Sequence, residues 1–166
     1  MIYFTSDTHF GHRSIIHLCQ RPYQHTQEMD EALIQNWNNV VSKNDTIYHL
    51  GDFSYKTDLR TSQQIFDRLN GKKFLIFGNH DKLGKKLVGW EDIDGGVEFK
   101  DNGRIFFLSH FPVKSFPSRY VNLHGHCHNS LPRSQNQYDM GVDVPEWNYT
   151  PVSFDTIRER LQNERD

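Results

Sequence analysis

Residues 2–9 of the chain, IYFTSDTH, contain the pattern that decides the fold. Ile2–Thr5 is a short run of apolar and β-branched residues, which predicts a buried β-strand. The strand leads into a polar loop that carries Asp7 and His9 and continues to Gly11. This segment therefore predicts a strand whose carboxyl end presents a carboxylate and an imidazole.

The same unit, a strand followed by a residue of the kind that ligates metals, recurs along the chain. Asp101-Asn102-Gly103 separates two apolar arms and predicts a hairpin turn between residues 97–100 and 104–108. The later strands that we expect, each with the motif that follows it, are 46–50 (Gly51-Asp52), 73–77 (Gly78-Asn79-His80-Asp81), 104–108 (Ser109-His110) and 121–124 (Gly125-His126-Cys127-His128).

The intervening segments predict helices and one long loop. Thr26 is expected to cap a helix with an apolar stripe, because threonine accepts a hydrogen bond from the first turn. Residues 82–96 are rich in glycine and lysine and predict a loop. The other expected elements are helices over 14–20, 58–69 and 153–163 and a last strand over 138–144.

The residues at the strand ends are expected to meet in one pocket. In an open α/β sheet the carboxyl ends of the strands lie along one edge, where ligand crevices form. Carboxylate, amide and imidazole donors without a pair of thiolates suit Mn, Fe, Zn or Mg-like ions. The set is too large for one ion, and two ions about 3.5–4 Å apart are the recurring device for displacement at phosphorus. The sequence thus predicts a two-metal site.

From residue 5 to residue 128 the sequence resembles the calcineurin-like metallophosphoesterase superfamily. The blocks that carry the resemblance, in the superfamily's order, are Asp7-x-His9, Gly51-Asp52, Gly78-Asn79-His80-Asp81, His110 and Gly125-His126-x-His128. One block alone is uninformative, but the complete ordered set is specific. The resemblance implies an α/β fold of layered mixed β-sheets, a two-sheet sandwich flanked by helices, in a single domain over residues 1–166.

The resemblance also implies a role for each matching residue. The expected metal ligands are Asp7, His9 and His128 on the first ion, Asn79, His110 and His126 on the second, and Asp52 as the bridge between them. A hydroxide shared by the two ions would attack phosphorus in line. His80 would face the phosphate and protonate the leaving oxygen, and Asp81 would orient His80.

Residues beside these blocks stay open between a functional and a structural interpretation. His12 and Arg13 follow the first block closely enough to reach a substrate phosphate, or they only serve the loop. His124 either supports the neighbouring ligands or packs in the core, and Asp143 is given no role. The lysines that either guide a polyanionic substrate or form a solvated face are Lys82, Lys85 and Lys86.

Composition and charge restrict the class of protein. The chain has 166 residues, of which 36% are hydrophobic and 24% charged, and no apolar run approaches the ~18 residues of a membrane span. No basic leader precedes the first strand, and Cys19 and Cys127 are too few for a disulfide framework, so we expect a cytoplasmic protein with free thiols. A formal net charge of −2 argues against a protein that coats nucleic acid.

We therefore expect a hydrolase of phosphoric esters, either diesters or monoesters. The expected substrate is small or exposed, such as a nucleotide, a cyclic nucleotide or a nucleic-acid end, without a membrane or an obligate protein partner. Mn is the ion expected first, with Fe, Zn, Ni or Mg as alternatives. The competing interpretation is a non-catalytic scaffold on the same fold, but such a protein tends to lose ligands or the catalytic histidine, and this sequence retains them all.

Overall fold

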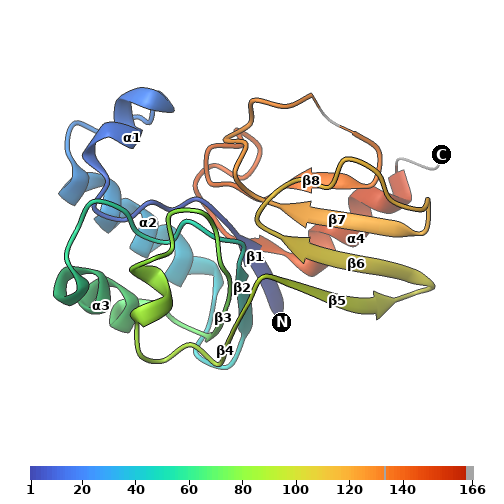
Figure 1. Cartoon of the computed structure of the whole chain (residues 1–166), viewed down its shortest axis with the longest axis horizontal. Coiled ribbons are helices and arrows are strands. Elements are labelled where there is room, and N and C mark those ends of the chain that lie inside the picture. The colour runs from blue at the N-terminus through green and yellow to red at the C-terminus, as the bar shows by residue number, and fades with distance from the viewer. Residues whose placement is uncertain (133, 164–166) are drawn as a thin grey trace.

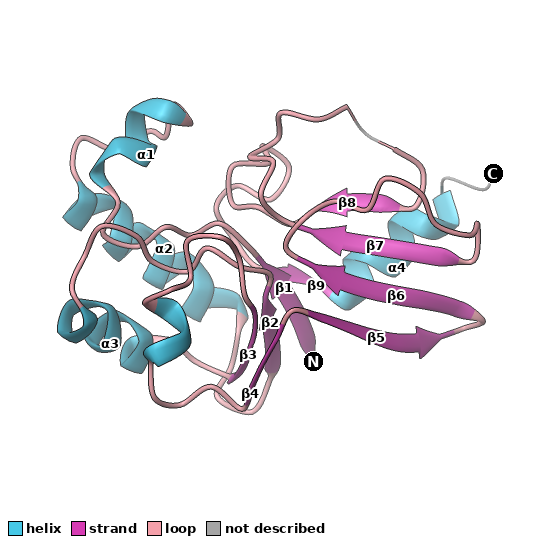
Figure 2. Cartoon of the chain, in the orientation of Figure 1, coloured by secondary structure: helices cyan, strands magenta, loops and turns pink. Residues whose placement is uncertain are grey.

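The computed structural model describes residues 1–132 and 134–163, and its strands form two sheets with helices beside them (Figures 1 and 2). The first sheet has the order β4-β3-β2-β1-β9. Its strands are β1 (Ile2–Thr5), β2 (Thr46–His49), β3 (Lys72–Ile76), β4 (Asp92–Asp94) and β9 (Val152–Ser153). Strands β1 to β4 pair in parallel, and β9 is antiparallel to β1.

The second sheet has the order β5-β6-β7-β8. Its strands are β5 (Gly96–Asp101), β6 (Arg104–Ser109), β7 (Tyr120–His124) and β8 (Gln137–Asp139). The expected hairpin is confirmed, because β5 and β6 pair antiparallel around Asn102 and Gly103. Both turn residues have positive φ, 45° and 78°, as a tight hairpin with right-handed strand twist requires. Strands β6, β7 and β8 pair in parallel.

The strand β1 is buried on both faces after Ile2, which explains its continuous apolar run. Neighbouring side chains of a strand point to opposite faces. Tyr3 accordingly packs with Leu33 and Trp37 on the helical side, whereas Phe4 packs with Phe106 of the second sheet and Phe154. The helices are α1 (Arg13–Leu18), α2 (Thr26–Val40), α3 (Leu59–Arg68) and α4 (Phe154–Asn163). The expected two-sheet sandwich flanked by helices is confirmed.

Some local expectations were wrong. Residues 82–96 are not only loop, because they contain the 3-10 helix η1 (Gly84–Lys86) and the edge strand β4. The sequence of β4, Asp-Ile-Asp, lacks an apolar pattern because two of its three side chains are exposed. Within 138–144, strand pairing ends at Asp139, and Gly141 instead forms an isolated bridge with Ser6, directly after β1. The short strand β9 was not predicted.

The cap of α2 also differs from the expectation. His25, and not Thr26, is the N-cap residue, and its Nδ1 accepts a hydrogen bond from the Glu28 N–H at 3.2 Å. An imidazole nitrogen can take the place of a hydroxyl here because the neutral ring has one free lone pair. Among the helices of the described residues, none combines the length and the apolar character that crossing a bilayer demands.

Candidate metal centre

The residues expected to bind metal follow β1, β2, β3, β6 and β7, so parallel strands deliver them to the same edge of each sheet. Backbone hydrogen bonds hold the loops together. The Asp7 N–H donates to the Gly51 carbonyl at 2.9 Å, and the Gly125 N–H donates to the His110 carbonyl at 3.0 Å. The His126 N–H donates to Oδ2 of Asp7 at 2.9 Å. That bond joins the first sheet's loops to those of the second.

Asp52 lies between the two groups of ligands that the sequence predicts. Its Oδ2 is 3.6 Å from Nε2 of His9 and 3.5 Å from Nε2 of His110. Its Oδ1 accepts a hydrogen bond from the His80 N–H at 2.8 Å. One oxygen is therefore held by the backbone, while the other faces an imidazole from each group.

The first half-site consists of Asp7, His9 and His128, whose potential ligand atoms lie within 4.8 Å of one another. Oδ1 of Asp7 is 3.9 Å from Nε2 of His128. This Oδ1 and Nε2 of His9 are buried without a hydrogen-bond partner among the described residues. Buried polar atoms are rarely left unpaired, because desolvation without a partner costs free energy. These orphaned oxygen and nitrogen donors fit a divalent cation.

The second half-site, as the sequence predicts it, consists of Asn79, His110 and His126. Nδ1 of His110 donates to the Leu50 carbonyl at 2.8 Å, while its Nε2 lies 3.0 Å from Oδ1 of Asn79. A neutral imidazole has only one N–H. If Nδ1 carries it, the lone pair of Nε2 faces the lone pairs of Oδ1 of Asn79. A cation bound between Nε2 and Oδ1 would remove this repulsion. The ring of His126 is 5.1 Å from that of His110.

Burial dominates the electrostatics of the first half-site. It raises the pKa of Asp7 to about 8, although His128 opposes the rise, and Asp139 adds to it. Burial also holds the pKa of His9 far below its usual range, and the positive neighbours His128 and Arg21 lower it further. A divalent cation would stabilise the buried carboxylate and would bind the neutral imidazole.

A buried ion pair braces the first half-site, and the sequence did not predict it. Nδ1 of His128 donates to Oδ2 of Asp143 at 2.7 Å, so Nε2 is the nitrogen that could ligate a cation, which would displace the proton of Nε2. Arg21 donates to both oxygens of Asp143, at 2.7 and 2.8 Å, and to the carbonyls of Asp7 and Thr8. No local signal could have identified Arg21, because it and Asp143 are 122 positions apart.

The loops that carry the ligands have strained backbones. The predicted ligands with positive φ are Asp7 (57°), His9 (49°), Asp52 (58°), His126 (70°) and His128 (47°). Each such conformation costs about 1–2 kcal/mol for a residue with a Cβ atom. Strain of this kind clusters at functional sites, where surrounding contacts maintain it. Gly125 shows how close the contacts are, because a Cβ there would lie 1.9 Å from Oγ of Ser6.

His80 and Asp81 have different surroundings. The His80 ring is half-buried, with its centroid 4.2 Å from the ring of Tyr55 and 5.6 Å from that of His9. The Asp81 carboxylate accepts hydrogen bonds from the N–H groups of Asp52, Phe53 and Gly78, at 2.6, 2.9 and 2.7 Å. These contacts fix the backbone around Asp52, and the role of Asp81 in orienting His80 stays a prediction.

The residues left open between a functional and a structural interpretation differ in their burial and contacts. His12 is buried, with its ring 5.3 Å from His9, and burial together with nearby Lys56 lowers its pKa to about 4. Arg13 is exposed at the start of α1. His124 is buried, and its Nδ1 donates to the Gly125 carbonyl at 2.8 Å. The loop lysines, all exposed, are Lys82, Lys85 and Lys86.

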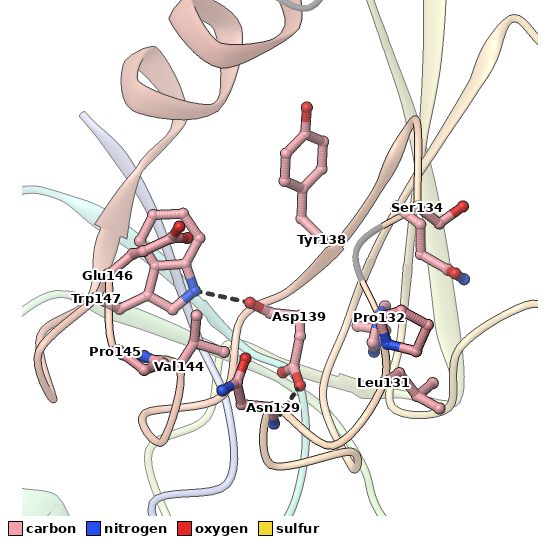
Figure 3. A pocket seen from close by; sticks show the side chains of 12 residues that line it. Asn129, Leu131, Pro132, Ser134, Tyr138, Asp139, Val144, Pro145, Glu146 and Trp147 are labelled. Carbon is pink, nitrogen blue, oxygen red and sulfur yellow. Dashed lines mark hydrogen bonds between the residues drawn. The ribbon is translucent and has the colours of Figure 1, made fainter.

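A cavity of about 340 Å³ lies beside β8 and the segments 129–132 and 144–147 (Figure 3). Asp139 forms one wall, and its carboxylate accepts from the N–H groups of Asn129 and Gly141 at 3.0 and 2.8 Å. Trp147 donates from Nε1 to the Asp139 carbonyl at 2.7 Å. None of the seven predicted metal ligands lines this cavity. Asp139 instead supports the loop that follows His128.

Comparisons with known proteins agree with this arrangement. A family model described as calcineurin-like phosphoesterase matches residues 1–157. The chain is 38% identical over 164 residues to the uncharacterized protein MJ1445 of Methanocaldococcus jannaschii. That match covers 94% of this chain and 88% of that protein. The chain is 30% identical over 180 residues to the gene 66 protein of Mycobacterium phage L5, with 86% of each covered.

A solved structure is also similar over nearly the whole chain. The crystal structure of AQ665, a protein of unknown function from Aquifex aeolicus, has a TM-score of 0.75 and 28% identity, and the match covers 96% of this chain and 98% of that one. The match by the family model extends over nearly the whole sequence and includes every predicted ligand. The chain therefore belongs to the calcineurin-like phosphoesterase family.

Proposed function

We propose that this chain hydrolyses phosphoric esters with two divalent ions, one in each half-site. The family is one of metal-dependent phosphoesterases. The observation that carries the proposal is the position of Asp52, whose Oδ2 lies within 3.6 Å of Nε2 of both His9 and His110. A carboxylate oxygen between two imidazoles from different sheets is suited to bridge two cations. The orphaned donor atoms of the first half-site support the same arrangement.

Two bound cations would lower the pKa of water and neutralise charge on the phosphoryl oxygens. The chain would supply the acid. In the proposed reaction water releases a proton to the solvent and its oxygen forms a new bond to phosphorus. The bond from phosphorus to the alcohol oxygen breaks, and His80 gives its proton to that oxygen and regains one from the solvent. The contact of the His80 N–H with Asp52 supports this role, because it ties the position of the acid to the bridging carboxylate.

The exposure of two of the three residues of the second half-site supports a small or accessible substrate. Asn79 and His126 are exposed, and the ring of Phe111, 51% exposed, stacks edge-on against His126 at 4.6 Å. We propose a nucleotide, a cyclic nucleotide or a nucleic-acid end, cleaved at a diester or a monoester. The donors are nitrogen and oxygen atoms, which suit Mn first and Fe, Zn, Ni or Mg as alternatives.

A metal analysis combined with a substrate panel tests the proposal. We expect about two divalent ions per chain, activity that a chelator abolishes, and recovery with Mn²⁺. The panel should contain p-nitrophenyl monoesters and diesters, nucleotides, cyclic nucleotides and DNA or RNA ends, each with Mn, Fe, Zn, Ni and Mg. At most one tight ion under all conditions would contradict the two-metal proposal. Two ions without turnover of any ester would favour the non-catalytic scaffold.

A further inference from the structure

A second pocket, of about 250 Å³, opens beside His80. Its walls are the loop after β2 and the segment after β3, strands that are neighbours in the first sheet. We call it the lysine pocket and define it by the lining residues Tyr55, Lys56, His80, Lys82, Leu83 and Lys86. None of these residues belongs to either half-site. The pocket therefore adjoins the metal centre without being part of it.

His80 connects the lysine pocket to the chemistry. Its ring forms one wall and packs against the ring of Tyr55, with 4.2 Å between the centroids and 50° between the planes. An acid that protonates the departing oxygen must stand on the side of phosphorus from which the alcohol leaves. Provided that His80 is this acid, the pocket lies on the leaving-group side of the reaction. What occupies it would be part of the alcohol that departs.

The charge of the lysine pocket is positive and unbalanced. Lys56, Lys82 and Lys86 are exposed, and in the part of the chain that the structure describes none of the three forms an ion pair. None of the described residues that line the pocket is acidic. The chain as a whole carries a formal charge of −2, so these cations form a local exception. Clefts with one sign of charge concentrate ligands of the opposite sign.

The two walls are held in place by hydrogen bonds to backbone carbonyls. The Tyr55 N–H donates to the Phe10 carbonyl at 3.2 Å, and Lys56 has a positive φ of 54°. On the other wall the Lys85 N–H donates to the Asp81 carbonyl, and Nε1 of Trp90 donates to the Gly84 carbonyl, both at 3.0 Å. The lysines thus project from anchored segments, which lowers the entropy lost when they bind an anion.

We propose that the lysine pocket binds a second phosphate, carried by the alcohol that leaves during hydrolysis. The preferred substrates are then esters whose leaving group is itself a phosphorylated nucleoside. This inference rests on the proposed function, because it needs His80 on the leaving-group side. Charged hydrogen bonds to the second phosphate favour such a substrate by about tenfold or more in kcat/KM. Exposed charges are screened by salt, so the preference should decrease as ionic strength rises.

The dinucleotide TpT and its forms with an added terminal phosphate, pTpT and TpTp, test the proposal. Product analysis first shows which nucleoside leaves, and the form phosphorylated on that nucleoside should be cleaved about tenfold more efficiently than TpT, mainly through KM. The triple variant Lys56→Gln, Lys82→Gln, Lys86→Gln should bring the ratio close to one. A matched variant at exposed lysines outside the pocket, Lys43→Gln, Lys72→Gln, Lys100→Gln, should leave the ratio unchanged.

Each result decides for or against the lysine pocket. Equal cleavage of all three dinucleotides by the parent, or an unchanged ratio in the pocket variant, would overturn it. If the parent cleaves no ester, the proposed function fails instead, and calorimetry decides the pocket. Thymidine 3′,5′-bisphosphate should then bind the parent about tenfold more tightly than thymidine 5′-monophosphate, and the pocket variant should lose this difference. Equal affinity of the parent for these two nucleotides would overturn the proposal that the lysine pocket binds a second phosphate.

Discussion

The two half-sites differ in how the chain surrounds their ligands. Asp7 in the first is fully buried, and His128 is braced by Asp143. In the second, His126 lies at the surface, and the ring that packs against it, Phe111, is itself 51% exposed. Preorganised ligands lose less entropy on binding, so the first half-site should hold its ion more tightly. The second half-site, in which Asn79 and His126 are exposed and only His110 is buried, should exchange its ion more readily and admit the substrate.

The largest effect should come from Asp52→Asn, which would remove the difference between the half-sites. The affinity for both ions should fall by more than about 100-fold, because a bridging ligand contributes more than the outer residues around a metal. Asp7→Asn and Asn79→Ala should each weaken mainly one ion. Titration with Mn²⁺ followed by calorimetry measures both affinities. If Asp52→Asn weakens only one ion, Asp52 does not bridge.

His80 lies outside both half-sites, so His80→Ala should leave both affinities unchanged and act only on the reaction. Loss of a positioned acid typically costs ~10²–10⁴ in rate. The loss should be smaller for p-nitrophenyl esters, because a good leaving group needs little protonation. The measurement pairs metal content with kcat on an activated and an unactivated ester. Loss of metal, or an equal loss on both esters, would contradict the general-acid role.

Asp143→Asn should lower the metal affinity of the first half-site and leave that of the second unchanged. An amide keeps the size of the carboxylate but removes the charge that orients His128 and pairs with Arg21. Outer residues of this kind typically contribute 10–100-fold to metal affinity. Titration should therefore show one weakened ion, with the second unchanged. Asp92→Asn, on an exposed edge strand, is the matched control. An equal loss of metal affinity in this control would show that Asp143 does not support the first half-site.

The smallest effect should come from Phe111→Ala, which removes the ring that packs on the second half-site. The ring is 4.9 Å from that of His110 and 4.6 Å from that of His126. Aromatic contacts of this kind contribute about 0.5–1.5 kcal/mol, so the affinity for the second ion should fall by about two- to tenfold. A loss of affinity for the first ion alone would contradict the assignment of Phe111 to the second half-site.

Much of the fold could be predicted because local patterns encode it. Buried parallel strands read as continuous apolar runs, as in Ile2–Thr5, and Asp101-Asn102-Gly103 specifies a turn with positive φ. Strand β4 could not be predicted in this way, because its polar residues pair only with the edge of β3. The same holds for β9, which consists of two residues and depends on β1 for its hydrogen bonds.

By itself the sequence determined the family and the set of candidate ligands, because each ligand lies a few residues from a strand end and its neighbours along the chain identify it. Only the tertiary structure decided which groups support those ligands. Asp81 contacts the backbone around Asp52, and Arg21 reaches Asp143 across 122 positions. The physical reason is that hydrogen bonds over such separations depend on how the two sheets and their loops pack, and no local pattern records that packing.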